Sequence, residues 1–294
     1  MKIDKVLFAC SASTEYSPFW NLQARIYKEH LGIEPVCLLF HGKKADTGMT
    51  EEHGKIIEME TDPSLPWSVQ MVWSKFDYPT REPDTTWMIG DIDLVPLQRA
   101  HFIDKLAPVP DTAYAHLNPS GISQARLGCF DGFITHGPER RAKDQGISGG
   151  ADLPGHYHAA KGKGFELFTQ GRPFLEQVRH IVSSDRYGMG VMSNQPKTQI
   201  KDNPYWYYWC AEECYSSLIL WTAMKEGLIN FVPIYYNNGN DTDRINRDCF
   251  TNGNYVYSAQ KVAAHGYVDI HCARPYAVQH EALARIVKLA WGIE

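Results

Sequence analysis

The sequence predicts a mixed α/β fold whose mainly parallel sheet is flanked by helices. Two features favour this class. Short, continuous apolar runs that end in polar turns are typical of parallel strands buried on both faces, and a helical pattern separates the first two runs, as in a βαβ unit. The chain has 294 residues, of which 44% are hydrophobic and 21% are charged, and this composition excludes a disordered or fibrous protein.

The first hundred residues alternate between strand and helix patterns. Residues 6–10 are an apolar run that is followed by a polar turn. Residues 19–30 carry apolar side chains at helical spacing, and Gly32 ends this pattern. A strand, a helix and a second strand in this order begin a doubly wound sheet. The further strands that we expect in this part are residues 35–40, 55–59 and 86–89.

After residue 100 the pattern is less regular. Residues 280–291 have apolar side chains on one face and predict an amphipathic C-terminal helix. No internal repeat or linker interrupts the chain, so we expect one domain over residues 1–294. The other elements expected here are a strand at 112–117, mostly loops at 118–164, helices at 173–183 and 209–225, a strand at 231–235 and a polar loop at 236–254.

Charge and cysteine content exclude several classes of protein. Lys and Arg number 29 against 34 Asp and Glu, a net charge of -5, so we expect no broad nucleic-acid surface, whereas a local basic pocket for a phosphate is compatible with this balance. The seven cysteines form no CxxC pair, which favours free thiols in a reducing compartment. No apolar run is long enough to span a membrane, and the first is too short for a signal peptide. We therefore expect a cytoplasmic protein.

Asp91 and Asp93 are the most informative residues of the chain. A second Asp-x-Asp, at residues 241–243, shows that the bare pattern is not specific, but only the first pair follows a fully apolar strand, where α/β sheets bind ligands. In an extended chain both carboxylates would point to one side, about 6.5–7 Å apart. They would repel each other without a cation, so we expect a divalent metal ion with open positions for a diphosphate. Gly90 is expected to leave room for that ligand. The alternative to a metal site is that Asp91 and Asp93 lie on a solvated turn after the strand.

The stretch WMIGDIDLVPL, residues 87–97, resembles the metal-binding strand of the GT-A glycosyltransferases, which transfer a sugar from a nucleotide-diphosphate donor with Mn²⁺ or Mg²⁺. The later stretch YVDIHCARPY, residues 267–276, is similar to a late segment of the family-8-like members. That segment contains a histidine and, after it, a basic residue, a proline and an aromatic residue. By this resemblance His271 completes the metal site with Asp91 and Asp93, and Arg274 meets the diphosphate. The usual glycine of that segment is missing, and Cys272 and Ala273 stand in its neighbourhood.

The resemblance implies a GT-A (Rossmann-like) domain with a nucleotide-binding half at about 1–100 and an acceptor-binding half at about 101–294. It also implies metal-dependent transfer to a hydroxyl of a glycan or glycoconjugate, with a UDP-sugar as the default donor. One imidazole and two carboxylates suit Mn²⁺ somewhat better than Mg²⁺. The donor contacts that it implies are Ala9, Ser11, Tyr16, Lys75, Asp91, Ile92 and Arg274.

The acceptor side is expected near the predicted helix at 209–225, where an aromatic run meets two acids. In the family an acidic segment before a helix faces the sugar and the acceptor, so Glu212, with Glu213 close behind, would deprotonate the attacking hydroxyl or steady the donor. The helix dipole by itself also favours acids there. The other expected acceptor contacts are Trp206 and Tyr205, by stacking on the sugar, and His158 and Lys161 of a Gly/Lys-rich loop.

Two other functions are also compatible with the sequence. A nucleotidyltransferase or metal-dependent phosphate hydrolase uses paired aspartates after a strand as well, but should show further carboxylates or a glycine-rich phosphate loop. A non-catalytic carbohydrate-binding protein would keep the aromatic residues and would not need His271 or Arg274. The sequence does not specify the sugar, the nucleotide, the acceptor, the stereochemical outcome or the oligomeric state.

Overall fold

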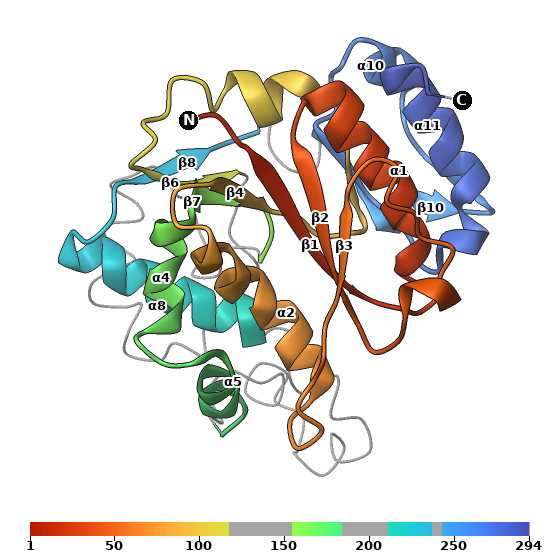
Figure 1. The fold of residues 1–294 in the computed structure, drawn as a ribbon. Coiled ribbons are helices and arrows are strands. Elements are labelled where there is room, and N and C mark those ends of the chain that lie inside the picture. The colour runs from red at the N-terminus through yellow and green to blue at the C-terminus, as the bar shows by residue number, and fades with distance from the viewer. Residues whose placement is uncertain (118–154, 184–210, 237–242, 294) are drawn as a thin grey trace, which may run out of the picture. The chain divides into compact units, whose positions relative to one another are not determined.

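A computed structural model of the chain describes residues 1–117, 155–183, 211–236 and 243–293 (Figure 1). It has the mixed α/β architecture that the sequence predicts. A mainly parallel, seven-stranded sheet with the strand order β3-β2-β1-β4-β7-β6-β8 is flanked by helices. Among the described residues, no helix is both long enough and apolar enough to cross a membrane.

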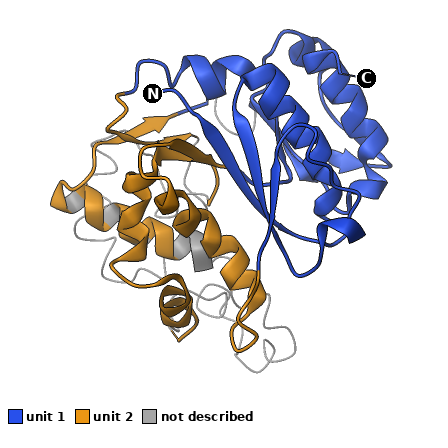
Figure 2. Ribbon diagram, in the orientation of Figure 1, with its two compact units in different colours: residues 1–59, 90–109, 235–294 blue, residues 60–89, 110–234 orange. Residues whose placement is uncertain are grey.

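The chain divides into two compact units that alternate along the sequence (Figure 2). Unit 1 consists of residues 1–59, 90–109 and 235–294, and unit 2 of residues 60–89 and 110–234. The predicted division into a nucleotide-binding half and an acceptor-binding half near residue 100 stays a prediction.

Three parallel strands run through unit 1: β1 (Lys5–Ser11), β2 (Glu34–Phe40) and β3 (Lys55–Glu58). The pairing of β1 with β2 runs from Lys5 opposite Glu34 to Ser11 opposite Phe40. Apart from the partly exposed Ala9, the apolar side chains of β1 and β2 are buried on both faces of the sheet, which explains why their sequences are continuous apolar runs and do not alternate. All three strands that the sequence predicts for this part are confirmed.

The helix predicted at residues 19–30 is confirmed, although its type changes along its length. A 3-10 turn (Ser17–Phe19) leads into α1 (Trp20–Arg25), which continues as a π-helical turn (Ile26–Leu31). Gly32 ends the segment in the left-handed conformation at φ 72°, where glycine has no steric cost. The helix α1 packs against β2.

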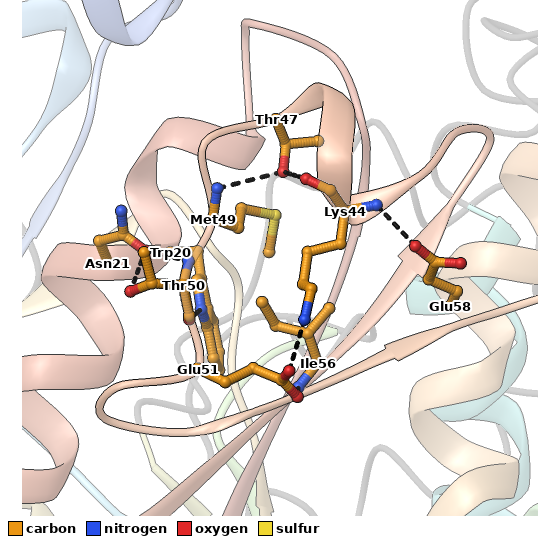
Figure 3. Close-up of polar contacts among 9 residues, drawn as sticks. All are labelled: Trp20, Asn21, Lys44, Thr47, Met49, Thr50, Glu51, Ile56 and Glu58. Atoms are coloured by element: carbon orange, nitrogen blue, oxygen red, sulfur yellow. Dashed lines mark hydrogen bonds and ion pairs between the residues drawn. The ribbon is translucent and has the colours of Figure 1, made fainter.

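Side-chain hydrogen bonds anchor the connection between β2 and β3 (Figure 3). At one end, the indole nitrogen of Trp20 on α1 donates to the carbonyl of Thr50 over 2.7 Å. At the other end, the backbone nitrogen of Lys44 donates to Glu58 on β3 over 2.7 Å. Glu51, which follows Thr50, accepts from the Lys44 ammonium and from the backbone nitrogen of Ile56. The crossover is therefore fixed to both a helix and a strand of unit 1.

Unit 1 also has a three-stranded sheet in the order β5-β12-β9. Its central strand β12 (Asp269–His271) pairs antiparallel with β5 (Leu94–Pro96) and parallel with β9 (Arg244–Ile245). Strands of two or three residues are too short to show a periodic pattern, and for this reason the prediction of a polar loop at 236–254 missed β9. The same segment contains a short hairpin, β10 (Phe250–Thr251) and β11 (Asn254–Tyr255).

Two helices complete the C-terminal part of unit 1. They are α10 (Ala259–Ala263) and α11 (His280–Trp291), which pack against each other. The predicted amphipathic helix is confirmed by α11, because it buries Leu283, Ile286 and Val287.

The strands of unit 2 are β4 (Thr86–Ile89), β6 (Tyr114–Leu117), β7 (His158–Lys161) and β8 (Phe231–Ile234). β7 pairs antiparallel with both β4 and β6, and β6 pairs parallel with β8. The strand β7 corrects the prediction of mostly loops at 118–164, because residues 158–161 form a strand. Its surrounding glycines indicate a loop, but Gly162 is required by packing, because an added Cβ would lie 2.2 Å from the carbonyl oxygen of Glu82.

Helices cover the strands of unit 2. They are α2 (Trp67–Asp77), α4 (Glu166–Thr169), α5 (Phe174–Ser183) and α8 (Ala211–Glu226). The helices predicted at 173–183 and 209–225 are confirmed by α5 and α8. α2 contacts the other three helices, with Trp73 and Phe76 in the aromatic core of the unit.

A buried polar network joins β9 and β12 in unit 1. The guanidinium of Arg244 donates to both carboxylate oxygens of Asp269, over 2.6 and 2.7 Å. The hydroxyl of Tyr236 donates to the same carboxylate, and the ring of Tyr236 stacks on His101 at 5.5 Å between centroids. His101 is fully buried, and neither of its ring nitrogens has a hydrogen-bond partner among the described residues. Burial, with the Lys105 ammonium nearby, lowers the pKa of His101 to about 3.

The buried neutral ring of His101 predicts a loss of stability in mild acid. The unfolded chain binds a proton at His101 below about pH 6.5, whereas the folded chain does so only near pH 3, so the free energy of unfolding decreases as the pH falls through this window. Between pH 7 and pH 5 this residue should account for about 2 kcal/mol. In urea titrations, His101→Phe should lose correspondingly less stability over this range, and equal losses in both proteins would contradict the assignment.

Candidate functional site

Two of the three predicted metal ligands, Asp91 and Asp93, lie on a turn. The backbone nitrogen of Leu94 donates to the carbonyl of Asp91 over 3.1 Å, so residues 91–94 form a β-turn between β4 and β5. The extended geometry predicted for Asp91 and Asp93 is therefore wrong. The turn ends at Leu94, where β5 begins and pairs with β12. A local sequence pattern does not include this distant strand.

Gly90, directly before this turn, is explained by the core. A Cβ at this position would lie 2.5 Å from Cε1 of Phe8 on β1. The residue also holds the backbone in place, because its nitrogen donates to the carbonyl of Leu7 over 2.8 Å. The glycine thus accommodates an aromatic ring, where the sequence suggested room for a ligand.

Asp93 is the centre of a charged cluster in unit 1. Asp93 is 8% exposed. The carboxylate oxygen Oδ2 lies 3.8 Å from Nε2 of His271 and 3.4 Å from Nε of Arg274. The backbone brings these residues together, because His271 pairs with Leu94 and the nitrogen of Cys272 donates to the carbonyl of Asp93 over 2.8 Å.

Arg274 connects Asp93 to the loop that follows β1. Its Nη1 donates to the hydroxyl of Tyr16, and its guanidinium carbon lies 5.2 Å from the centre of the Tyr16 ring. A hydrogen bond also fixes the backbone next to Arg274, since the nitrogen of Ala273 donates to the hydroxyl of Tyr255 over 2.6 Å. Four of the predicted site residues, Tyr16, Asp93, His271 and Arg274, therefore lie in one cluster.

The electrostatics of Asp93 favour a cation beside it. Burial raises the pKa of the Asp93 carboxyl, and the negative charge of Asp91 raises it further, while Arg274 and Arg247 oppose this effect. The sequence interpretation missed Arg247, which lies on a 3-10 turn (Arg247–Cys249). The only available signal was a basic residue within a predicted polar loop.

The donor set of the cluster fits a hard divalent ion of the Mn²⁺ or Mg²⁺ type. Adjacent ligand atoms in an octahedron with bonds near 2.1 Å are roughly 3 Å apart. Oδ2 of Asp93 and Nε2 of His271 lie 3.8 Å apart, so these two side chains would have to approach each other slightly to share one ion. Asp91, the third predicted ligand, is half-buried on the same turn. Within the described ranges, no three His, Cys, Asp or Glu side chains are already grouped around one point that could hold a metal.

The other predicted donor contacts are distributed over both units. In unit 1, Ala9 and Ser11 lie on β1, and the Ser11 hydroxyl donates to Ser13 over 3.0 Å. Ile92 is buried within the acidic turn. Lys75 lies on α2 in unit 2, where it is 3% exposed and its ammonium donates to the carbonyl of Gly155 over 3.5 Å.

The predicted acceptor contacts belong to unit 2. His158 on β7 has no exposed surface, and its Nδ1 is 3.0 Å from the hydroxyl of Tyr114, so it is a core residue of the unit. Lys161, at the end of β7, lines a surface pocket of about 120 Å³ together with Lys163. Glu212 and Glu213 lie in the first turn of α8, with their side chains outside the described atoms. Tyr205 and Trp206 lie outside the described residues.

Comparisons with known proteins return structural likenesses only. No protein-family model matches the chain, and no curated protein matches it. Among solved structures, the chain is similar to the galactosyltransferase LgtC in complex with donor and acceptor sugar analogues, with a TM-score of 0.46, 10% identity and coverage of 98% of this chain and 96% of LgtC. It is also similar to the bifunctional glycosyltransferase WbbM, with a TM-score of 0.45, 10% identity and coverage of 99% of this chain and 50% of WbbM.

The contact between Gly90 and Phe8 predicts that Gly90→Ala is destabilising. The new methyl group would overpack the ring, and we expect a cost of about 1–3 kcal/mol in the free energy of unfolding, measured in urea. In a Phe8→Leu background the same substitution should cost clearly less, because the clashing ring is gone. An identical cost in both backgrounds would show that the ring is not the reason for the glycine.

Proposed function

We propose that this protein is a metal-dependent glycosyltransferase that moves a sugar from a UDP-sugar to a hydroxyl of a glycan or glycoconjugate. The observation that carries the proposal is the cluster around Asp93. The sequence stretches at 87–97 and 267–276 both resemble parts of a donor site, and the contacts of Asp93 with His271 and Arg274 join them.

In this proposal Asp91, Asp93 and His271 hold a Mn²⁺ or Mg²⁺ ion. When bound, the ion would neutralise part of the negative charge that develops on the diphosphate as the sugar leaves. The role of Asp93 is to present its carboxylate at the base of the site, where burial strengthens its interaction with any cation. His271 offers a nitrogen donor from the adjacent strand β12.

Arg274 is proposed to bind the diphosphate of the donor. A guanidinium offers several planar donors that match phosphate oxygens, and the hydroxyl of Tyr16 orients this one. Because Arg274 already lies 3.4 Å from Asp93, it would bind the donor beside the proposed metal site. Ala9, Ser11 and Ile92 are proposed to surround the nucleotide. Lys75 is not included, because its side chain is buried in unit 2 and its ammonium donates to the carbonyl of Gly155.

Glu212 and Glu213 are the proposed acids of the acceptor side. One of them would deprotonate the attacking hydroxyl in an inverting reaction or steady the reacting face of the donor in a retaining one. Tyr205 and Trp206 are proposed to stack on a sugar, and Lys161 to line the acceptor site. Because of its burial we do not include His158. The proposed location is the cytoplasm.

Nucleotide binding should depend on the metal and on Asp93. In thermal-shift measurements with UDP, GDP or ADP, we expect the nucleotide of the donor to raise the melting temperature only when Mn²⁺ is present. Without ligand, Asp93→Asn should melt near the temperature of the unsubstituted protein. With Mn²⁺ and the nucleotide, its melting temperature should not rise. Equal stabilisation in excess EDTA, or in Asp93→Asn, would contradict the proposed site.

Turnover distinguishes the proposal from the two alternative functions. With Mn²⁺ and a panel of UDP-sugars and glycans, we expect UDP release that requires an acceptor and yields a new glycosidic bond. Phosphate or nucleoside-monophosphate release without an acceptor would favour the hydrolase or nucleotidyltransferase. Sugar binding without any release would favour a carbohydrate-binding protein.

The role of Arg274 predicts a selective loss of nucleotide affinity. Arg274→Gln removes charge-assisted hydrogen bonds, so the Kd for Mn²⁺ and UDP together should rise by about 10- to 100-fold. Titration calorimetry would measure this Kd, with Arg99→Gln as the control. Arg99 donates to the carbonyl of His30 and lines a pocket with Met1 and Ile3, before β1, whereas Arg274 contacts Tyr16, after β1. Unchanged affinity in Arg274→Gln would exclude it as the phosphate partner.

A further inference from the structure

Gln23 on α1 is bonded directly to the backbone of the acidic turn. The side chain is completely buried, and its Nε2 donates to the carbonyl of Ile92 over 3.1 Å and to that of Leu94 over 2.7 Å. These two carbonyls flank Asp93. The carbonyl of Asp93 itself accepts from the backbone nitrogen of Cys272. Three successive backbone carbonyls, those of residues 92 to 94, therefore accept hydrogen bonds, two of them from a single side chain.

The orientation of this amide is determined by its surroundings. If the oxygen and nitrogen were exchanged, the amide oxygen would face two carbonyl oxygens, which have no proton to donate. In the observed orientation Oε1 accepts no hydrogen bond within the described part of the chain. A buried acceptor without a partner is unfavourable, and an apolar residue of similar size would avoid it. What a glutamine supplies here, and an apolar residue does not, is the pair of donors.

The same face of the helix lies close to the acids. Tyr27, one turn after Gln23, is also completely buried. Burial raises the pKa of the Tyr27 hydroxyl well above its usual value, and the charges of Asp269 and Asp91 raise it further. Gln23 thus borders the acidic turn, and the Tyr27 hydroxyl lies within electrostatic range of Asp269 and Asp91.

We infer that Gln23 is a positioning residue that holds the acidic turn in the conformation in which the carboxylate of Asp93 meets His271 and Arg274. This inference rests on the proposed function, because it assigns to Gln23 the geometry of the proposed donor and metal site. Gln23 touches neither donor nor metal in this role. It acts through the backbone on both sides of Asp93.

Gln70 provides a matched control for a purely structural role. It lies on α2 in unit 2 and is 1% exposed. Its Nε2 likewise donates to two backbone carbonyls, those of Asp62 over 2.9 Å and Leu65 over 3.1 Å. Gln70 also accepts from the backbone nitrogen of Asp62 over 2.9 Å. Gln70→Met therefore removes three side-chain hydrogen bonds and Gln23→Met removes two, and only those of Gln23 belong to the acidic turn.

The test measures the Kd for Mn²⁺ and UDP together by calorimetry, with the urea midpoint of each variant as a record of stability. We expect Gln23→Met to raise the Kd at least tenfold, while Gln70→Met stays within about twofold of the unsubstituted protein at a similar loss of stability. If Gln23→Met does not fold, Gln23→Asn, whose amide is one carbon too short to reach both carbonyls, should show the same selective loss.

The outcomes separate this inference from the proposed function. If the unsubstituted protein does not bind Mn²⁺ and UDP together, the proposed function and the inference both fail. If it binds them and Gln23→Met or Gln23→Asn binds them equally well, only the inference fails. Equal weakening by Gln23→Met and Gln70→Met would also overturn it, because binding would then follow general stability.

Discussion

A carboxylate held out of water has to be matched by positive charge and hydrogen bonds, and this requirement organises the site around Asp93. Asp93 is buried on a turn, next to another acid, so its negative charge is unfavourable unless basic groups approach it. The groups that do so, His271 and Arg274, come from the other end of the sequence. Their approach requires the pairing of β5 with β12, and the small second sheet of unit 1 is therefore the part of the fold that makes the site possible.

The sequence predicts the long elements well and the short ones poorly. β1 and β2 are continuous apolar runs, and α11 has a clear apolar face, so each can be recognised from its own residues. β9 and β12 have two and three residues and are defined by their partners. His271 and Arg274 could be identified because residues 267–276 resemble a segment of a known family, whereas the turn that replaces the expected extended geometry could not. That turn is determined by strand pairing with a distant segment.

Gln23 shows why periodicity alone misses residues that support a site. A helical pattern identifies the buried face by its apolar side chains, so residues such as Leu22 are expected inside and a glutamine outside. In the structure Gln23 is buried and Leu22 is partly exposed. The carbonyls of the acidic turn need donors, and only a polar side chain can supply them away from water. A polar residue between apolar neighbours on a helix was the available signal, and it acquires meaning only when the distant acceptors are known.

The position of β12 between two strands has a consequence for how this segment can vary. Asp269 and His271 are two residues apart and so share one face of the strand. The first pairs with Arg244, and the second meets Asp93. Inserting or deleting one residue between them would exchange the faces, so that the imidazole would take the place of Ile270 or Cys272 in the apolar interior. A change of one residue in length would therefore displace either Asp269 or His271 from the face that they share, even where both side chains are kept.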